Sequence, residues 1–240
     1  MKTNCKEHFA SLNHQFGQMI EGSFSSNLGP KLVELFQFSD DLNIWTELLK
    51  DGTDCTILVS AIQEFELGFQ AVVSGQYRYS FIAQRYFLEQ ICRFIYLSTN
   101  ELHLRHWKLG LRDISWGSLV DKENGIFSKI FIRAFYAEVE SEGGHLVTIA
   151  SKLYRESSEF IHGNFNKIEE LPNSIEFNPS LLERWIDFME TSKFLALFLL
   201  FMRFSKDIEG HDLSKIGEMA KEEQLFRVVI YTDAVCLRHC

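Results

Sequence analysis

The sequence predicts an all-α protein, and three observations predict it. The chain has 240 residues but only 3 prolines, and proline is the residue least compatible with a helix interior. Apolar residues recur at steps of three and four over long stretches, which is the period of one helix face. The segments between these stretches are short, so a single helical domain over residues 1–240 is the simplest architecture.

The first hundred residues are interpreted as a series of helices. One short helix is expected within 1–29, before the loop GSFSSNLGP, and Pro30 suits the first turn of the next helix. Residues 1–50 could form a helical extension. The stretch DGTD at 51–54 interrupts the pattern and can cap a helix whose apolar face covers about 58–72. The next helix, over 77–97, carries Arg85 and Glu89 at the spacing of an intrahelical ion pair.

The second half of the chain is less regular. Short helices and turns are expected over 101–126, and a helix over the stretch GIFSKIFIRAFYAEV. A helix over 145–162 should end at Gly163, a residue that often ends helices in the left-handed conformation. Residues 164–179 are expected to be a connector, followed by a long helix over 180–205. After Gly210, residues 213–237 should form one or two helices, although VVIYTDAVCL could also be a strand.

The long helix contains the run FLALFLLFM at 194–202, which is apolar nearly all round. Such a helix must be covered by its own chain or by a partner chain. The run has 9 residues, far fewer than the roughly 20 that cross a bilayer, so no membrane span is expected. The five cysteines are irregularly spaced and no secretory signal opens the chain. A reducing, cytoplasmic setting is therefore predicted.

The net charge of −9 argues against a simple non-specific nucleic-acid binder, because phosphate neutralisation normally requires a basic surface. Any contact with nucleic acid should therefore use a local basic pocket or a groove between two chains. Three arginines of the 77–97 helix could supply such local charge, or they could form a solvated, ion-paired face. They are Arg78, Arg85 and Arg93.

The segment YRESSEFIHGN, at the end of the 145–162 helix, contains residues suited to phosphodiester chemistry. Seven residues separate Arg155 from His162, nearly two full turns, so both project from one face. The histidine could take or give a proton, and the arginine could offset charge on the transition state, without a metal or cofactor. The alternative is structural: Arg155 and Glu159 have ion-pair spacing, and a histidine is common at a helix end.

One histidine per chain does not supply both an acid and a base. Two chains related by a two-fold axis would bring two arginines and two histidines into one cleft. Tyr154 could stack on a base, or it could belong to the half-buried core. His103 and His106 stand three residues apart but lack further ligands, so no metal site is expected.

The R-x6-H pattern near a helix end resembles the signature of the HEPN superfamily (higher eukaryote and prokaryote nucleotide-binding domains). That signature is an arginine, four to six intervening residues and a histidine. More locally, YRESSEFIHGN looks like the YRxxSxxxHG segment of a group of uncharacterised bacterial helical proteins. Stretches like 75–97 and 106–129 also recur in that group, so the loose resemblance covers about residues 55–165.

The resemblance implies an HEPN-like helical bundle, with its core over 54–205 and additional N- and C-terminal helices. It implies a homodimeric, metal-independent endoribonuclease that acts on RNA as a toxin or antiviral-defence effector, restrained by a regulatory protein partner. Arg155 and His162 would be catalytic, and four neighbours would support them. The supporting residues are Tyr154, Ser158, Glu159 and Asn164.

One position departs from the family pattern. Most active members carry a polar residue, often asparagine, directly after the arginine, and here Glu156 follows it. Inactive members of the superfamily serve as binding or scaffold modules. The alternative function is therefore a non-catalytic HEPN-like module that binds a nucleotide, RNA or a protein partner.

Overall fold

A computed structural model of the chain describes residues 4–208, and all regular secondary structure in that range is helical, which confirms the all-α class. The helices expected over 213–237, and the strand that was their alternative, lie outside the described residues. In chain order the elements are α1 (Cys5–Ser25), α2 (Gly29–Phe36), α3 (Phe38–Leu49), α4 (Thr56–Val73), α5 (Tyr77–Leu97), α6 (Glu101–Lys108), α7 (Trp116–Leu119), α8 (Lys129–Tyr136), the 3-10 helix η1 (Ala137–Glu142), α9 (Gly143–His162), α10 (Phe165–Glu170) and α11 (Pro179–Phe204).

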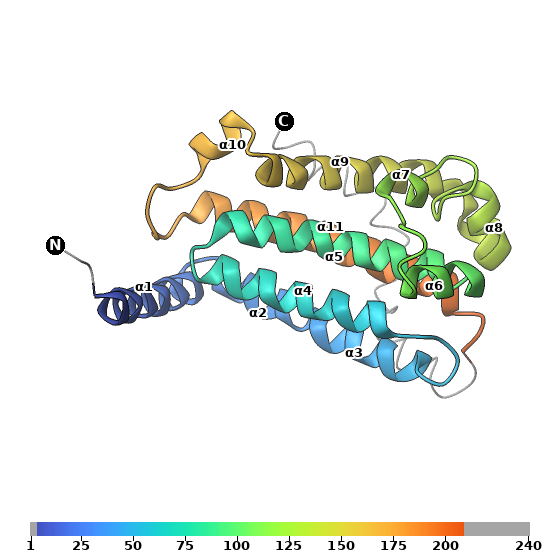
Figure 1. Ribbon diagram of the computed structural model, residues 1–240, viewed down its shortest axis with the longest axis horizontal. Helices are drawn as coiled ribbons and strands as arrows, with labels where there is room; N and C mark the ends of the chain where they lie inside the picture. Colours follow the sequence, from blue (N-terminus) through green and yellow to red (C-terminus); the bar gives the residue numbers. More distant parts are fainter. Residues whose placement is uncertain (1–3, 209–240) are drawn as a thin grey trace.

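The long helices form a layered bundle with α5 at its centre. Helix α5 packs against α4, α9 and α11, and α3 packs against the outer side of α4. In Figure 1, α9 lies along the top of the bundle, α5 and α11 form the middle, and α2, α3 and α4 lie below. Helix α9 therefore covers one face of the central helices α5 and α11, and its outer side faces away from them.

Burial explains why α5 and α11 occupy the middle. Helix α5 buries side chains on nearly every side, including Phe81, Phe87 and Ile91. The apolar run of α11 is buried from Phe194 to Leu200. This chain therefore covers the run by itself, and the run does not require a partner chain.

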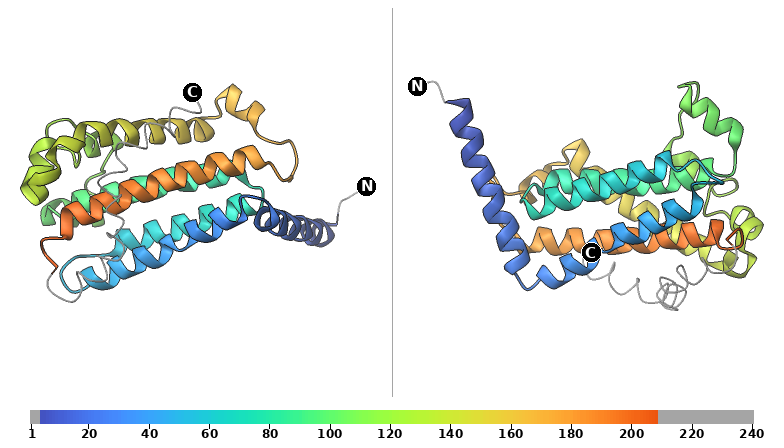
Figure 2. Two further views of the ribbon diagram at one scale, coloured as in Figure 1. Left: turned by 180° about the vertical axis from the view of Figure 1, so that it is seen from behind. Right: turned by 90° about the horizontal axis from the view of Figure 1, so that it is seen from below.

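The N-terminal region divides into two parts. Helices α2 and α3 supply Leu32, Phe38 and Trp45 to the buried core, so they belong to the bundle. Helix α1 has 21 residues, more than the short helix expected, and its only buried residue is Ser23. The right-hand view of Figure 2 shows α1 crossing one end of the bundle and projecting past it. Only α1 therefore extends outside the bundle.

The helix that carries YRESSEFIHGN begins at Gly143 and ends at His162, two residues longer at its start than predicted. Gly163 adopts φ 65° and ψ 39°, the left-handed conformation expected at this stop. The predicted helix over GIFSKIFIRAFYAEV is shorter, because Ser128 caps α8 and a 3-10 turn replaces its last residues. The expected connector contains α10, which the sequence pattern missed because so short a helix shows no clear apolar period.

One described helix, α4, is long and apolar enough to cross a membrane by length and composition alone. In the bundle, 56% of that stretch is buried inside the protein. A buried core helix of this composition passes the same test as a membrane span. The expectations of no membrane association and of a cytoplasmic location stay predictions.

Candidate functional site

The outer side of α9 presents Arg155 and His162 together. The inner side of this helix buries apolar residues such as Leu153 and Phe160 against the bundle. Arg155 and His162 are exposed. Thr148, about two helical turns before Arg155 on the same ridge, is also exposed. The two functional candidates lie about 10 Å apart along the helix axis. They therefore line one ridge, and within a single chain that ridge faces outward.

The ion pair expected between Arg155 and Glu159 is not formed. Instead Glu159 Oε2 lies 3.9 Å from Lys167 Nζ, on α10. The neighbouring Glu156 carboxylate lies 3.9 Å from Lys152 Nζ and 4.0 Å from Arg184 Nη2. The carboxylates of Glu156 and Glu159, which are near Arg155 on α9, thus lie beside other cations. Within residues 4–208, the guanidinium of Arg155 and the ring of His162 have no hydrogen-bond or ion-pair partner.

Two of the proposed supporting residues use their polar atoms in local structure. Ser158 Oγ donates to the Tyr154 carbonyl oxygen at 2.5 Å, within α9. The Asn164 side chain accepts from the Asn166 backbone N–H at 3.2 Å and so caps α10. Both residues lie next to the ridge, but their contacts shape the end of α9.

Tyr154 lies in a stack that the sequence reasoning did not foresee. Its ring is parallel to that of Trp116 on α7, with centroids 4.0 Å apart and an interplanar angle of 3°. Arg85 Cζ lies 4.4 Å from the centroid of the Tyr154 ring, and Arg85 Nη2 donates to the Tyr154 hydroxyl. The stack therefore ties α7 and α5 to α9, and it occupies the faces with which Tyr154 would stack on a base.

The three arginines of α5 have different environments. Arg78 is exposed, and its Nε donates at 3.1 Å to the Phe160 carbonyl oxygen, two residues before His162. Arg85 lies 3.9 Å from Glu89, which confirms the predicted intrahelical pair. Arg93 is 7% exposed and donates to Glu89 Oε1 at 2.9 Å. Only Arg78 thus combines exposure with a position beside the end of α9, while Arg93 offers no surface that a phosphate could reach.

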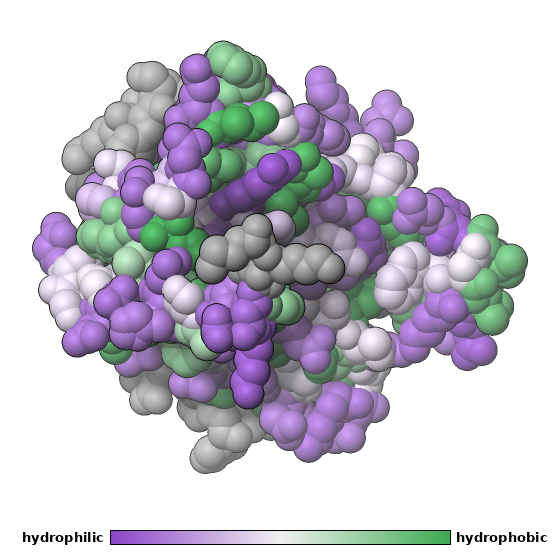
Figure 3. All heavy atoms as spheres, turned by 60° about the vertical axis from the view of Figure 1, so that its left-hand side comes forward, coloured by the Kyte–Doolittle hydropathy of each residue, from purple (hydrophilic) through white to green (hydrophobic). Residues whose placement is uncertain are grey.

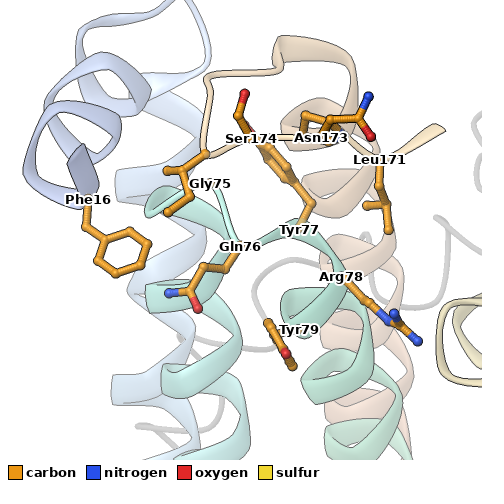
Figure 4. A pocket seen from close by; sticks show the side chains of 11 residues that line it. Phe16, Gly75, Gln76, Tyr77, Arg78, Tyr79, Leu171, Asn173 and Ser174 are labelled. Carbon is orange, nitrogen blue, oxygen red and sulfur yellow. The ribbon is translucent and has the colours of Figure 1, made fainter. Parts of the chain in front are cut away.

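A cavity of about 400 Å³ adjoins this end of the bundle. Its walls come from α1, from the turn into α5 and from residues 171–175, and Arg78 is one of the lining residues. Figure 4 shows the Phe16 ring of α1 on one side of the cavity and Leu171, Asn173 and Ser174 on another. The sequence analysis missed this cavity, because its walls come from three segments of the chain, at residue 16, residues 75–79 and residues 171–175, which no local pattern connects. The only local signal was Tyr79, an aromatic residue that is 63% exposed.

No group of three or more potential metal-ligating side chains occurs among residues 4–208. His103 instead faces Arg112, whose Nη1 lies 2.9 Å from the histidine Nε2. Because the guanidinium can only donate, His103 Nε2 accepts this hydrogen bond.

Comparison of the chain with family models, with curated proteins and with solved structures finds no match in any of the three.

Proposed function

We propose that the protein is a metal-independent endoribonuclease of HEPN type, which acts as a homodimer and serves as a cytoplasmic toxin or antiviral-defence effector. One observation carries the proposal: Arg155 and His162 are exposed on one ridge and have no partner in the described chain, while the carboxylates beside them are paired elsewhere. An unpaired arginine keeps its full charge and all its donors for a phosphate.

The proposed reaction needs two ridges that face each other. One His162 takes the proton of the ribose 2′-hydroxyl, and the 2′-oxygen bonds to the phosphorus. The bond from phosphorus to the 5′-oxygen then breaks, and the second His162 donates its proton to that oxygen. The two Arg155 guanidinium groups offset the charge that develops on the phosphate oxygens. Arg78, held at the end of α9, adds positive charge beside each histidine.

The test is to incubate the purified full chain with labelled mixed RNA in EDTA. We expect cleavage by the native protein and loss of at least 100-fold in the Arg155→Ala and His162→Ala variants. Thr148→Ala, on the same ridge, and Arg105→Ala, an exposed arginine on α6, are the matched controls and should cleave normally. Cleavage that EDTA abolishes, or that survives both ridge variants, would contradict the proposal.

The second candidate is a non-catalytic module that binds a nucleotide, RNA or a protein partner on the same ridge. The observation that favours it is that Arg155 and His162 are both exposed on α9 of the single chain. Binding of RNA that weakens in both ridge variants, without cleavage by a protein shown to be dimeric, would favour this second candidate.

A further inference from the structure

Exposed hydrophobic residues are common on protein surfaces, and scattered ones need no explanation. On the face of the molecule shown in Figure 3, hydrophobic residues lie in small groups among hydrophilic ones. Helix α1 is different, because residues along one of its faces form one seam with alternating steps of four and three, as in a coiled coil. The seam residues are Cys5, Phe9, Leu12, Phe16, Met19 and Ser23.

The second half of this seam rests on the bundle of its own chain. Ser23 Oγ donates to the Val73 carbonyl oxygen at 3.2 Å, at the end of α4. A Cβ atom on Gly75 would lie 3.3 Å from Met19 Cγ, so Met19 packs closely on the turn between α4 and α5. Phe16 lines the cavity at the same end of the bundle. The seam is therefore an apolar contact surface over this half.

The first half of the seam continues past the bundle. Cys5 is exposed, the Phe9 side chain is 58% exposed and Leu12 is half-buried. Residues 4–14 form about 15 Å of helix that projects from the bundle, as the right-hand view of Figure 2 shows. A helical segment this short is only marginally stable in water without tertiary contacts. A surface that covered the seam of the projecting half would therefore stabilise it.

The seam is symmetric about His14. The spacing of Cys5, Phe9 and Leu12, read backwards, equals that of Phe16, Met19 and Ser23. A two-fold axis near His14 sets two α1 helices side by side and antiparallel. Each projecting half then lies over the end of the other bundle, next to the α1 helix already docked there.

The end of the bundle has space for such a neighbour. The cavity of about 400 Å³ lies directly beside α1 and is lined by both apolar and polar residues, with Tyr79 63% exposed at its wall. Arg78 lines the cavity, and the exposed Glu176 directly follows its last lining residue, Ile175. The projecting half likewise carries both signs of charge, in Lys6 and Glu7. The cavity therefore offers apolar contacts with charges of both signs beside them, and the seam of the projecting half has the same combination.

We propose that the occupant of this cavity is α1 of a second copy of the chain, so that two copies form a dimer by exchanging their projecting halves. Phe9 and Leu12 of each copy pack against the Tyr79 side of the other. The proposal does not depend on ribonuclease activity, and it supplies a two-fold contact at the bundle end where α9 terminates.

The first experiment measures the mass of the native chain by sedimentation or light scattering at several concentrations. We expect twice the chain mass of 28.0 kDa. The double substitution Phe9→Glu, Leu12→Glu and the single substitution Tyr79→Glu should each halve the mass, because they charge the two sides of the same contact. Ile130→Glu, at a residue that is 71% exposed on α8, is the matched control and should stay dimeric. Far-UV circular dichroism verifies that every variant is folded.

Mixing the two monomeric variants makes the test specific for exchange. The Phe9→Glu, Leu12→Glu chain keeps an intact cavity, and the Tyr79→Glu chain keeps an intact projecting half. A mixed pair therefore retains one of its two contacts, whereas either variant alone retains none. We expect the mixture to regain dimer at concentrations where each variant alone is monomeric.

A monomeric native chain, or a charged α1 variant that stays dimeric, would overturn the proposal. Failure of the mixture to regain dimer would overturn the exchanged arrangement in favour of direct packing of one α1 on the other. A nucleotide bound in the cavity of a monomeric native protein would assign the cavity to a ligand instead. A monomeric native chain would also remove the homodimer on which the proposed reaction depends. The charged α1 and Tyr79 variants test only the exchanged contact, and absence of RNA cleavage by a dimeric native chain would count against the proposed activity alone.

Discussion

Ser157 on α9 donates a hydrogen bond to the side-chain oxygen of Gln84 on α5, and both side chains are buried. Gln84 Nε2 in turn donates to Ser192 Oγ on α11 at 2.8 Å, and Ser192 donates to the Phe188 carbonyl oxygen at 2.9 Å. This chain of hydrogen bonds joins three helices inside the bundle. Ser157 lies two residues from Arg155, on the opposite side of α9. These hydrogen bonds therefore fix the position of the helix that carries the proposed catalytic ridge.

Substitution of Gln84 by leucine should destabilise the fold. The Ser157 hydroxyl would lose its acceptor in a buried setting, and Ser192 would lose a donor, so we expect a loss of about 1–3 kcal/mol in the free energy of unfolding. Urea denaturation followed by circular dichroism measures it. The Ser157→Ala, Gln84→Leu double variant should lose less than the sum of the single variants, because the two residues share one hydrogen bond. Strictly additive losses would contradict this coupling.

The Tyr154 hydroxyl and the Tyr154 ring should contribute separately to stability. Tyr154→Phe removes only the hydrogen bond with Arg85 and should cost about 1 kcal/mol. Tyr154→Ala also removes the stack on Trp116 and should cost about 3 kcal/mol in thermal or urea unfolding. RNA cleavage, if present, should survive Tyr154→Phe. A normal free energy of unfolding in Tyr154→Ala, with lost cleavage, would instead make Tyr154 a substrate contact.

The pair of Asp54 and Lys108 should make part of the stability depend on pH. The hydrogen bond from Lys108 lowers the pKa of the Asp54 carboxyl from its ordinary value of 3.8 to about 2. A carboxyl whose pKa is depressed in the folded state stabilises that state above its unfolded pKa. The contribution is therefore complete above about pH 4 and is lost as the pH falls toward 2.

Asp54→Asn tests this dependence, because an asparagine can still accept from the Thr56 backbone N–H as Asp54 does. The variant should lose about 1 kcal/mol or less at pH 7, since the pair is partly exposed. The difference in melting temperature from the native protein should shrink between pH 4 and pH 2, and also in 1 M salt. A difference that is constant across this pH range would show that the charge is not responsible.

Gly163 should control the end of α9 and, with it, the position of His162. Its φ of 65° is unfavourable for residues with a Cβ atom, so Gly163→Ala should cost about 1 kcal/mol in unfolding free energy. Gly163→Asn should cost less, because asparagine tolerates the left-handed conformation better. Hydrogen exchange at the last amides of α9 should accelerate in the alanine variant. Equal stability of the alanine and native proteins would contradict a conformational role for this glycine.

The sequence by itself determined the features that depend on local backbone geometry. The helical class, the need to cover the apolar run of α11 on all sides and the common face of Arg155 and His162 all follow from a period of 3.6 residues per turn. The stop at Gly163 follows from the conformational freedom of a single residue. These properties need only residues that are close together in the chain.

Only the tertiary structure decided which partners the side chains of these helices meet. Glu159 pairs with Lys167 rather than Arg155, Trp116 covers Tyr154, and Arg93 is buried. The projecting half of α1 and the cavity beside it likewise depend on how distant helices end relative to one another. Helical periodicity states which residues share a face, but the packing of that face is set by side chains far away in the sequence, whose positions a local pattern does not contain.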